Sequence, residues 1–170
     1  QALLAEAGYP NGENFPEVTL TYNNAANKKS VAEAVQQMWK ENLNINVKLI
    51  GVENETIGAI RKSGDYDIVR HGWSADYPDA MTFLSTFTEG HYSKFNNEDY
   101  KKCMKTAITV TGKERDQAML DGEKILINDQ AALIPLYEVV DTCMIRDSVK
   151  GWDKTGYNGW FFGYTDIVEK

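Results

Sequence analysis

The ten residues 70–79 organise the rest of the chain, and they read Arg70-His71-Gly72-Trp73-Ser74-Ala75-Asp76-Tyr77-Pro78-Asp79. They follow residues 66–69, which read as a buried strand, and precede residues 80–87, which read as a helix. In open α/β sheets, ligands bind at the point where strands end and helices begin. The stretch also carries a cation, a large aromatic side chain and two carboxylates. We therefore interpret it as one half of a ligand-binding cleft.

Two strand–helix–strand units lead up to this stretch. Strands are predicted at residues 18–22, 45–51 and 66–69 from their β-forming and alternating apolar residues. A first helix is expected from Ser30, which has Glu33 at the spacing of a capping box, and a second over residues 56–62. Right-handed crossovers between such strands make the sheet parallel. The pattern predicts an α/β fold with βαβ units flanked by helices.

Further elements are predicted after the stretch. Asn97 is a plausible N-cap for one amphipathic helix, and Thr111 begins a capping box for another that runs to about residue 128. Residues 131–140 read as a strand at a sheet edge because they contain Pro135, and residues 143–145 continue extended. The aromatic tail 151–170 is expected to pack on this domain or on a missing lobe. We expect residues 1–170 to form one α/β domain.

Composition excludes several classes of protein. The chain has 170 residues and a net charge of −7, which disfavours nucleic acid and anionic lipid as partners. It lacks a run of about 18 apolar residues, so we expect no direct membrane span. The first residues look like the last turns of a helix that Gly8 closes. We therefore expect the chain to begin inside a larger protein.

The motifs of common enzymes are missing from the sequence. It contains no dinucleotide fingerprint, P-loop or nucleophile elbow. His71 and His91 do not make a metal site, and nothing beside Asp76 and Asp79 supplies a nucleophile or activates a water. We expect a protein that is not an enzyme and needs no metal or cofactor.

Two cysteines lie far apart in the sequence, Cys103 on a predicted helix and Cys143 in a predicted strand. Their spacing excludes a redox or zinc pair. Two buried thiols are the favoured interpretation, and a disulfide is left open.

Asp76 and Trp73 could together bind an ammonium group. A carboxylate offers a charge-assisted hydrogen bond, and an aromatic face adds a cation–π contact. The alternatives are that Asp76 is a turn residue before the helix and that Trp73 belongs to the core; Asp79 fits helix capping better than Asp76 does.

The neighbouring residues allow two interpretations as well. Arg70 could bind a carboxylate in bidentate fashion or form a structural bridge to Asp65 or Asp67. His71 is more typical of a satisfied structural histidine than of a ligand contact. Gly72 and Ser74 would offer backbone groups to which a peptide could add as a strand.

Taken together, four segments resemble the oligopeptide-binding proteins, the solute-binding subunits of ABC peptide importers (extracellular solute-binding protein family five). The first is Leu3-Leu4-Ala5-Glu6-Ala7-Gly8-Tyr9-Pro10 with Gly12 and Phe15-Pro16. The second is Gly64-Asp65-Tyr66-Asp67 with Gly72-Trp73-Ser74-Ala75-Asp76-Tyr77 and Phe83-Leu84. The third opens a helix at residues 96–100, and the fourth is Arg115 with Glu123-Lys124-Ile125-Leu126 and Ile134-Pro135-Leu136-Tyr137.

The resemblance implies a two-lobed protein, of the periplasmic binding protein type II fold, that closes on a peptide and delivers it to an ABC permease. This chain would be most of the C-terminal lobe, with the N-terminal lobe missing. The protein would be extracytoplasmic, in the periplasm or held at the outer face of the membrane by a lipid anchor on the missing part.

The resemblance also implies roles for the residues of the stretch. Asp76 would hold the peptide's α-ammonium group, and Trp73 would pack beside it. The segment from His71 through Gly72 to Ser74 would pair with the peptide backbone, and Arg70 would neutralise acidic groups of the ligand. Binding of a dipeptide, a nickel chelate or a sugar on the same scaffold, or a role as a pheromone-peptide signalling receptor, remains an alternative.

Overall fold

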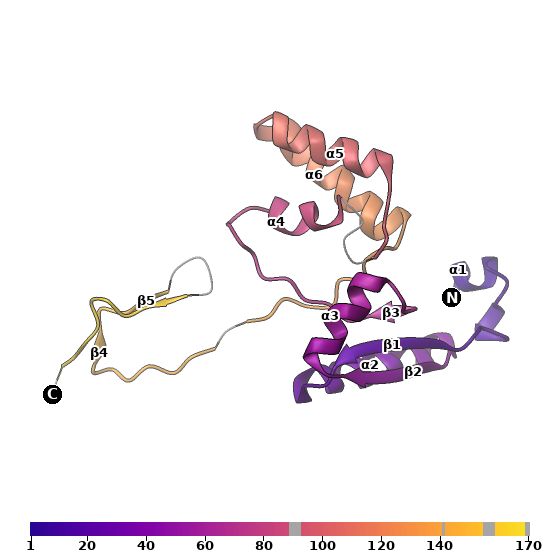
Figure 1. Cartoon of the computed structure of the whole chain (residues 1–170), viewed down its shortest axis with the longest axis horizontal. Helices are drawn as coiled ribbons and strands as arrows, with labels where there is room; N and C mark the ends of the chain where they lie inside the picture. The colour runs from indigo at the N-terminus through magenta and orange to yellow at the C-terminus, as the bar shows by residue number, and fades with distance from the viewer. Residues whose placement is uncertain (89–92, 141, 155–158, 169–170) are drawn as a thin grey trace. The chain divides into compact units, whose positions relative to one another are not determined.

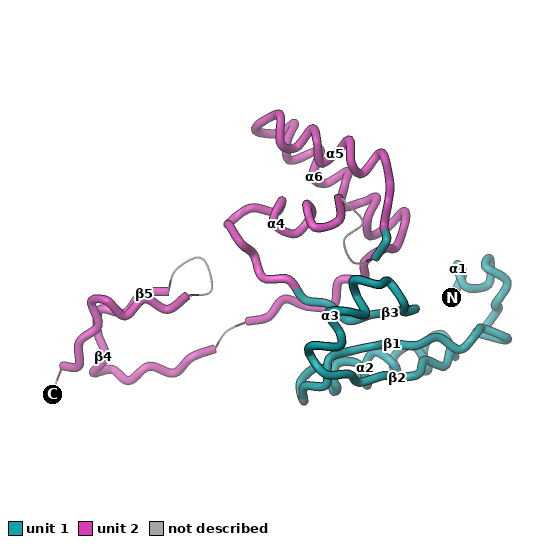
Figure 2. The backbone as a smooth tube through the Cα atoms, in the orientation of Figure 1, with its two compact units in different colours: residues 1–72, 90–94 teal, residues 73–89, 95–170 magenta. Residues whose placement is uncertain are grey.

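The computed structural model describes residues 1–88, 93–140, 142–154 and 159–168. The chain divides into two compact units, coloured separately in Figure 2. Unit 1 comprises Gln1–Gly72 with Gly90–Lys94, and unit 2 comprises Trp73–Glu89 with Phe95–Lys170. Each unit has a buried apolar cluster of its own. The single domain expected from the sequence stays a prediction.

Unit 1 is built on a parallel sheet of three strands, β1 (Val18–Asn23), β2 (Val47–Val52) and β3 (Ile68–Val69), in the order β2-β1-β3 (Figure 1). The long helix α2 (Ala26–Leu43) connects β1 to β2, and α3 (Asn54–Ser63) connects β2 to β3. The predicted parallel βαβ units are therefore confirmed.

The core of unit 1 forms where the central strand meets α2. It consists of the buried side chains Leu20, Tyr22, Ala32, Ile45 and Val47, with Leu4, Phe15, Trp39, Leu43 and Ile68 packed against them. The central strand β1 also pairs directly with β3, which is the strand that leads into the stretch 70–79.

Two details of unit 1 differ from the predictions. Helix α2 begins at Ala26 with Ala25 as its N-cap, so Ser30 lies inside the helix and the predicted capping box at Ser30 is wrong. The backbone turns sharply after β1, where the Ala25 N–H donates to the Asn23 carbonyl at 2.8 Å, and the helix can therefore start at once. Strand β3 is shorter than expected and only half-buried, since it has a single partner strand.

Helix α1 (Ala2–Glu6) ends as the sequence indicated. Gly8 has a φ of +92°, and the Gly8 and Tyr9 N–H groups donate to the Ala5 and Leu4 carbonyls at 3.0 and 2.9 Å. This is the Schellman pattern, which needs a left-handed residue just after the helix. The following 3-10 turn, η1 (Pro10–Gly12), brings Gly12 against the Leu43 carbonyl at the end of α2, where a side chain would collide.

Unit 2 contains a group of helices (Figure 1). These are α4 (Met81–Leu84), the 3-10 turn η2 (Ser85–Phe87), α5 (Glu98–Thr109), α6 (Gly112–Lys124) and the π-helical turn η3 (Ile125–Asp129). The Asn97 side chain accepts a hydrogen bond from the Tyr100 N–H at 2.9 Å, which confirms it as the N-cap of α5. Thr111 is the N-cap residue of α6, but its side chain makes no capping bond.

The helices of unit 2 enclose the second core. Tyr100 is completely buried and donates its hydroxyl hydrogen bond to the Leu84 carbonyl at 2.6 Å, which ties α5 to α4. Around it pack Met81, Leu84, Phe95, Met104, Ala107, Ala118 and Leu126.

The C-terminal residues of unit 2 form two short antiparallel ladders. Strand β4 (Val149–Lys150) pairs with β7 (Asp166–Ile167), and β5 (Asp153–Lys154) pairs with β6 (Trp160–Phe161). The α/β fold class is confirmed; among the described residues the parallel pairs lie in unit 1 and the antiparallel pairs in this segment.

The strand predicted at residues 131–140 is wrong, and so is its continuation at 143–145. Neither segment is paired in a sheet of the described chain, and Val139 and Val140 are exposed. A strand needs a partner for its backbone groups, and β-forming residues alone do not supply one. Both cysteines are free; Cys103 is half-buried, but Cys143 is exposed, so the prediction of two buried thiols is wrong for Cys143.

Candidate ligand-binding site

The stretch 70–79 leaves the sheet directly after β3, and the boundary between the two units falls within it. Arg70, His71 and Gly72 belong to unit 1, whereas Trp73, Ser74 and Asp76 belong to unit 2. The structure therefore describes the predicted site as two groups of residues, each with its own supporting contacts.

Arg70 is held by the sheet and by α3. Its N–H donates to the Thr21 carbonyl of β1 at 2.8 Å, and its carbonyl accepts from Nη2 of Arg61 at 3.0 Å. Its own Nη1 donates to Oδ1 of Asn23 at 3.3 Å, at the carboxyl end of β1. The guanidinium is thus oriented by a neutral amide, and none of the ion pairs between described residues includes it.

The suggested structural bridge from Arg70 to Asp65 or Asp67 does not form within the described part of the chain. Asp67 instead accepts hydrogen bonds from the backbone N–H and the hydroxyl of Thr19, at 2.8 and 2.9 Å. These bonds lower the pKa of the Asp67 carboxyl, because they favour its charged form. Asp67 therefore links the start of β3 to β1 and does not pair with the positive charge of Arg70.

His71 is neutral at physiological pH. Burial, and then the nearby positive charges of Arg61 and Arg70, lower its pKa to about 4. Its Nδ1 accepts a hydrogen bond from the Gly72 N–H at 2.8 Å, which also requires that nitrogen to be unprotonated. His71 consequently shapes the backbone here and adds no charge to the site.

Trp73 and Ser74 lie at the surface of the protein. Trp73 is 43% exposed, so the alternative that it is an ordinary core residue is wrong for this chain. The large side chains of Tyr77 and Phe83 are exposed as well. A single exposed aromatic residue is unremarkable, but three within eleven residues are typical of a recognition surface.

The Asp76 carboxylate is exposed, whereas its backbone is anchored. The Asp76 N–H donates to Oγ1 of Thr82 at 2.9 Å, and that hydroxyl lies 3.5 Å from Oδ2 of Asp76. Thr82 is only 2% exposed, so the turn is fixed to a buried residue of α4. None of the ion pairs in the described ranges involves Asp76, and its negative charge is therefore available to a ligand.

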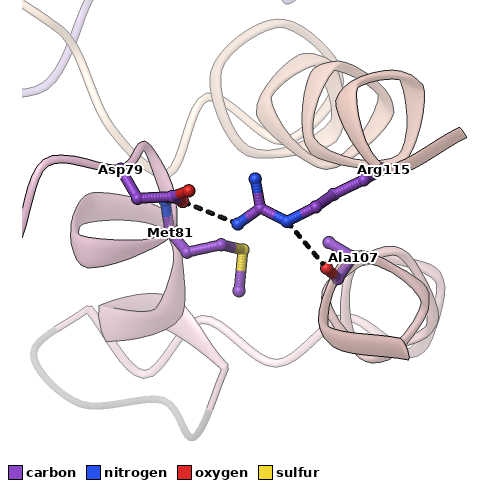
Figure 3. A network of polar contacts seen from close by, with 4 residues as sticks. All are labelled: Asp79, Met81, Ala107 and Arg115. Atoms are coloured by element: carbon purple, nitrogen blue, oxygen red, sulfur yellow. Dashed lines mark hydrogen bonds and ion pairs between the residues drawn. The ribbon is translucent and has the colours of Figure 1, made fainter. Parts of the chain in front are cut away.

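Asp79 has a different environment three residues later. Its Oδ1 accepts hydrogen bonds from the Met81 N–H at 2.8 Å and from Nη2 of Arg115 at 2.7 Å (Figure 3). Both bonds lower the pKa of the Asp79 carboxyl, the Arg115 bond more strongly. The N-cap residue of α4 is Ala80, and Asp79, one residue earlier, accepts a hydrogen bond from the first N–H of the helix, in agreement with its interpretation as a capping residue.

Three supporting residues were not identified from the sequence as parts of the site: Asn23, Thr82 and Arg115. Arg115 was noticed only as part of a family pattern, and it lies 36 positions from its partner Asp79. Neither residue carries a local signal for this pairing, because the contact depends on how α4, α5 and α6 pack.

Several known proteins are similar to this chain in sequence. Residues 1–95 match the bacterial extracellular solute-binding proteins, family 5 Middle. The periplasmic murein peptide-binding protein MppA of Escherichia coli K12 is 38% identical over 157 residues, which cover 89% of this chain and 29% of that protein. The periplasmic oligopeptide-binding protein OppA of Haemophilus influenzae is 36% identical over 156 residues, covering 88% and 28% respectively.

Solved structures of these two proteins have the same fold. The E. coli murein tripeptide binding protein MppA aligns with a TM-score of 0.84 at 34% identity, over 99% of this chain and 34% of that one. H. influenzae OppA in complex with RPPGFSPFR aligns with a TM-score of 0.82 at 32% identity, over 99% and 34%.

The matched residues and the shared fold place the chain in one family. It belongs to the bacterial extracellular solute-binding proteins, family 5. It spans less than a third of the length of the two curated relatives named above. None of the helices described is long and apolar enough to cross a membrane.

Proposed function

We propose that this chain supplies one wall of the cleft of a longer extracytoplasmic protein that binds oligopeptides and delivers them to an ABC permease. The Asp76 carboxylate is the anchor for the peptide's α-ammonium group. The observation that carries the proposal is an exposed carboxylate on an anchored turn that makes none of the described ion pairs. Family membership supports the choice of a solute as the partner of that charge.

The residues on either side of Asp76 suit a peptide. Trp73 is 43% exposed, so part of its indole can pack beside an ammonium group and a peptide backbone. Gly72 and Ser74 are exposed, so their backbone groups can pair with an extended ligand without selecting its side chains. Arg70, oriented by Asn23, keeps its positive charge for a carboxylate of the ligand.

The rest of the cleft lies outside this chain. The opposite wall belongs to a second lobe in the same polypeptide, as the short span relative to MppA and OppA supports. The two lobes close on the peptide, which is a common motion of hinged binding proteins. We place the protein in the periplasm, or at the outer face of the membrane on a lipid anchor, without catalytic activity, metal or cofactor.

The test is Asp76→Asn in the longer protein, titrated calorimetrically with a peptide whose N-terminus is free. We expect Kd to rise about 10- to 100-fold, because a charge-assisted hydrogen bond contributes ~1.5–3 kcal/mol. The fold should survive, since the Asp76 N–H bond to Thr82 uses the backbone and persists in the variant.

The matched control is Asp65→Asn, which removes the same charge from an exposed carboxylate of unit 1. Its affinity should equal that of the unchanged protein. The same peptide acetylated at its N-terminus should bind the unchanged protein weakly and should lose nothing more in Asp76→Asn. Unchanged affinity of Asp76→Asn for the free peptide would rule out the ammonium anchor, and equal binding of acetylated peptide would favour another ligand class.

A further inference from the structure

Arg115 joins three helices of unit 2 through its guanidinium group. Nη2 donates to Oδ1 of Asp79, before the start of α4, at 2.7 Å, and Nε donates to the Ala107 carbonyl in the last turn of α5 at 3.1 Å (Figure 3). Arg115 itself lies in the first turn of α6. Its side chain is 25% exposed and that of Asp79 is 31% exposed, so solvent screens the pair only in part.

A series of hydrogen bonds leads from this contact to the turn that carries Asp76. The Thr82 N–H donates to the Asp79 carbonyl at 3.2 Å, and the Thr82 hydroxyl accepts from the Asp76 N–H at 2.9 Å. The Asp79 N–H donates to the Tyr77 carbonyl at 2.8 Å, which closes the turn from the other side. The position of Asp79 therefore determines where the backbone of Asp76 lies.

We propose that Arg115 is a positioning residue for ligand binding, which holds Asp79 and thereby presents the Asp76 carboxylate to the peptide's ammonium group. This inference rests on the proposed function and deepens it. Arg115 does not touch the ligand; it acts through Asp79, Thr82 and the turn between residues 76 and 79.

The geometry requires an arginine at this position. The planar guanidinium directs separate N–H groups at a carboxylate and at a helix carbonyl, whereas a lysine offers one mobile ammonium. The positive charge also suits the C-terminal end of α5, where unpaired carbonyls carry partial negative charge. Arg115→Lys should therefore restore only part of what Arg115→Gln loses.

The experiment uses the longer protein with five variants: Arg115→Gln, Arg115→Lys, Asp79→Asn, Asp76→Asn, and Arg115→Gln combined with Asp76→Asn. Each is titrated with a free-amine peptide and with the same peptide acetylated at its N-terminus. We expect Arg115→Gln to weaken binding of the free peptide about 10-fold, as for partners in one hydrogen-bonded network. Binding of the acetylated peptide should stay unchanged, because it does not use the Asp76 charge.

Asp79→Asn tests the same contact from the other side, in case Arg115→Gln does not fold. The asparagine keeps an oxygen for the Met81 N–H but loses the charge that Arg115 holds. It should weaken binding of the free peptide in the same direction as Arg115→Gln. The matched control is Lys124→Gln, which breaks an exposed ion pair with Asp129 in the same unit and should leave both affinities unchanged.

The outcomes separate this inference from the proposed function. If Asp76→Asn weakens binding but Arg115→Gln does not, the anchor stands and the positioning role is overturned. If Arg115→Gln weakens both peptides equally, or if its effect persists undiminished in Asp76→Asn, Arg115 acts on the fold in general and the inference fails. If Asp76→Asn has no effect, the proposed function itself fails. Loss for the free peptide alone, absent in the Asp76→Asn background, supports the inference.

Discussion

The two carboxylates of the stretch show how a few hydrogen bonds assign different roles to identical groups. Asp79 accepts from Arg115 and from the first N–H of α4, so its charge is balanced within the protein. Asp76 is exposed three residues earlier, and the one hydrogen bond that its carboxylate accepts from the described residues is a long one, from the Thr82 hydroxyl at 3.5 Å. Burial of the neighbouring Thr82 keeps the Asp76 backbone in place while its charge faces solvent. This division of roles makes Asp76, and not Asp79, the candidate anchor.

His71 provides a prediction at the scale of one residue. Its pKa in the folded protein is about 4, below the ordinary 6.5, so the unfolded state binds more protons between these values. The free energy of unfolding should therefore rise with pH from about 4 to about 6.5 through this residue. An NMR titration of the imidazole should give a midpoint near 4.

The histidine resonances can be assigned with His91→Gln, since His91 is the other histidine of the sequence. In His71→Gln, the rise in stability over this pH range should become smaller, because glutamine does not titrate. A His71 midpoint near 6.5 would contradict the burial and the arginine charges that lower its pKa.

At the scale of elements, the start of a helix depends on whether the capping side chain reaches a free N–H. Asn97 does so at α5, where its oxygen lies 2.9 Å from the Tyr100 nitrogen. Thr111 has the extended backbone of an N-cap at α6 but makes no such bond. The two residues are therefore a matched pair for measuring what the side chain contributes.

Asn97→Ala should lower the free energy of unfolding by about 1 kcal/mol, the usual contribution of such a cap. Asn97→Asp should keep most of the stability because its carboxylate can accept the same hydrogen bond. Thr111→Ala should cost clearly less than Asn97→Ala. Urea unfolding of the three variants, followed by far-UV circular dichroism, measures the differences, and equal losses for Asn97→Ala and Thr111→Ala would contradict the assignment of the cap.

At the scale of the whole molecule, tight binding of a peptide requires more contacts than any single element provides. A peptide bound only to residues 70–79 would remain largely solvated, whereas tight binding needs most of its polar groups paired and its apolar groups buried. The exposed apolar residues of the C-terminal half, such as Val139, Val140 and Met144, also lack cover in the described chain. These exposed side chains agree with a chain that is part of a longer protein.

The isolated 170-residue chain should accordingly bind peptide at least about 100-fold more weakly than the longer protein. Calorimetric titration of both proteins with one peptide compares them directly. A retained far-UV circular dichroism spectrum is the control that the isolated chain is folded. Nanomolar affinity of the isolated chain would show that its own residues form a complete site.

The features that the sequence alone determined are those that depend on neighbours in the chain. The order of strands and helices in unit 1, the Asn97 cap and the turn at Gly8 follow from local periodicity and backbone preference, and each is present in the structure. The stretch 70–79 could be singled out for the same reason, since strand, turn and helix follow one another within a few residues.

Tertiary structure decided the features that depend on contacts between distant residues. Residues 131–140 have the composition of a strand but are unpaired in the described chain, because a strand exists only where another supplies its hydrogen bonds. Likewise, Arg115 meets Asp79 only because α4, α5 and α6 pack around Tyr100. Local sequence sets which elements can form, whereas the packing of distant side chains determines which of their polar groups meet and which, like the Asp76 carboxylate, take part in none of the described ion pairs.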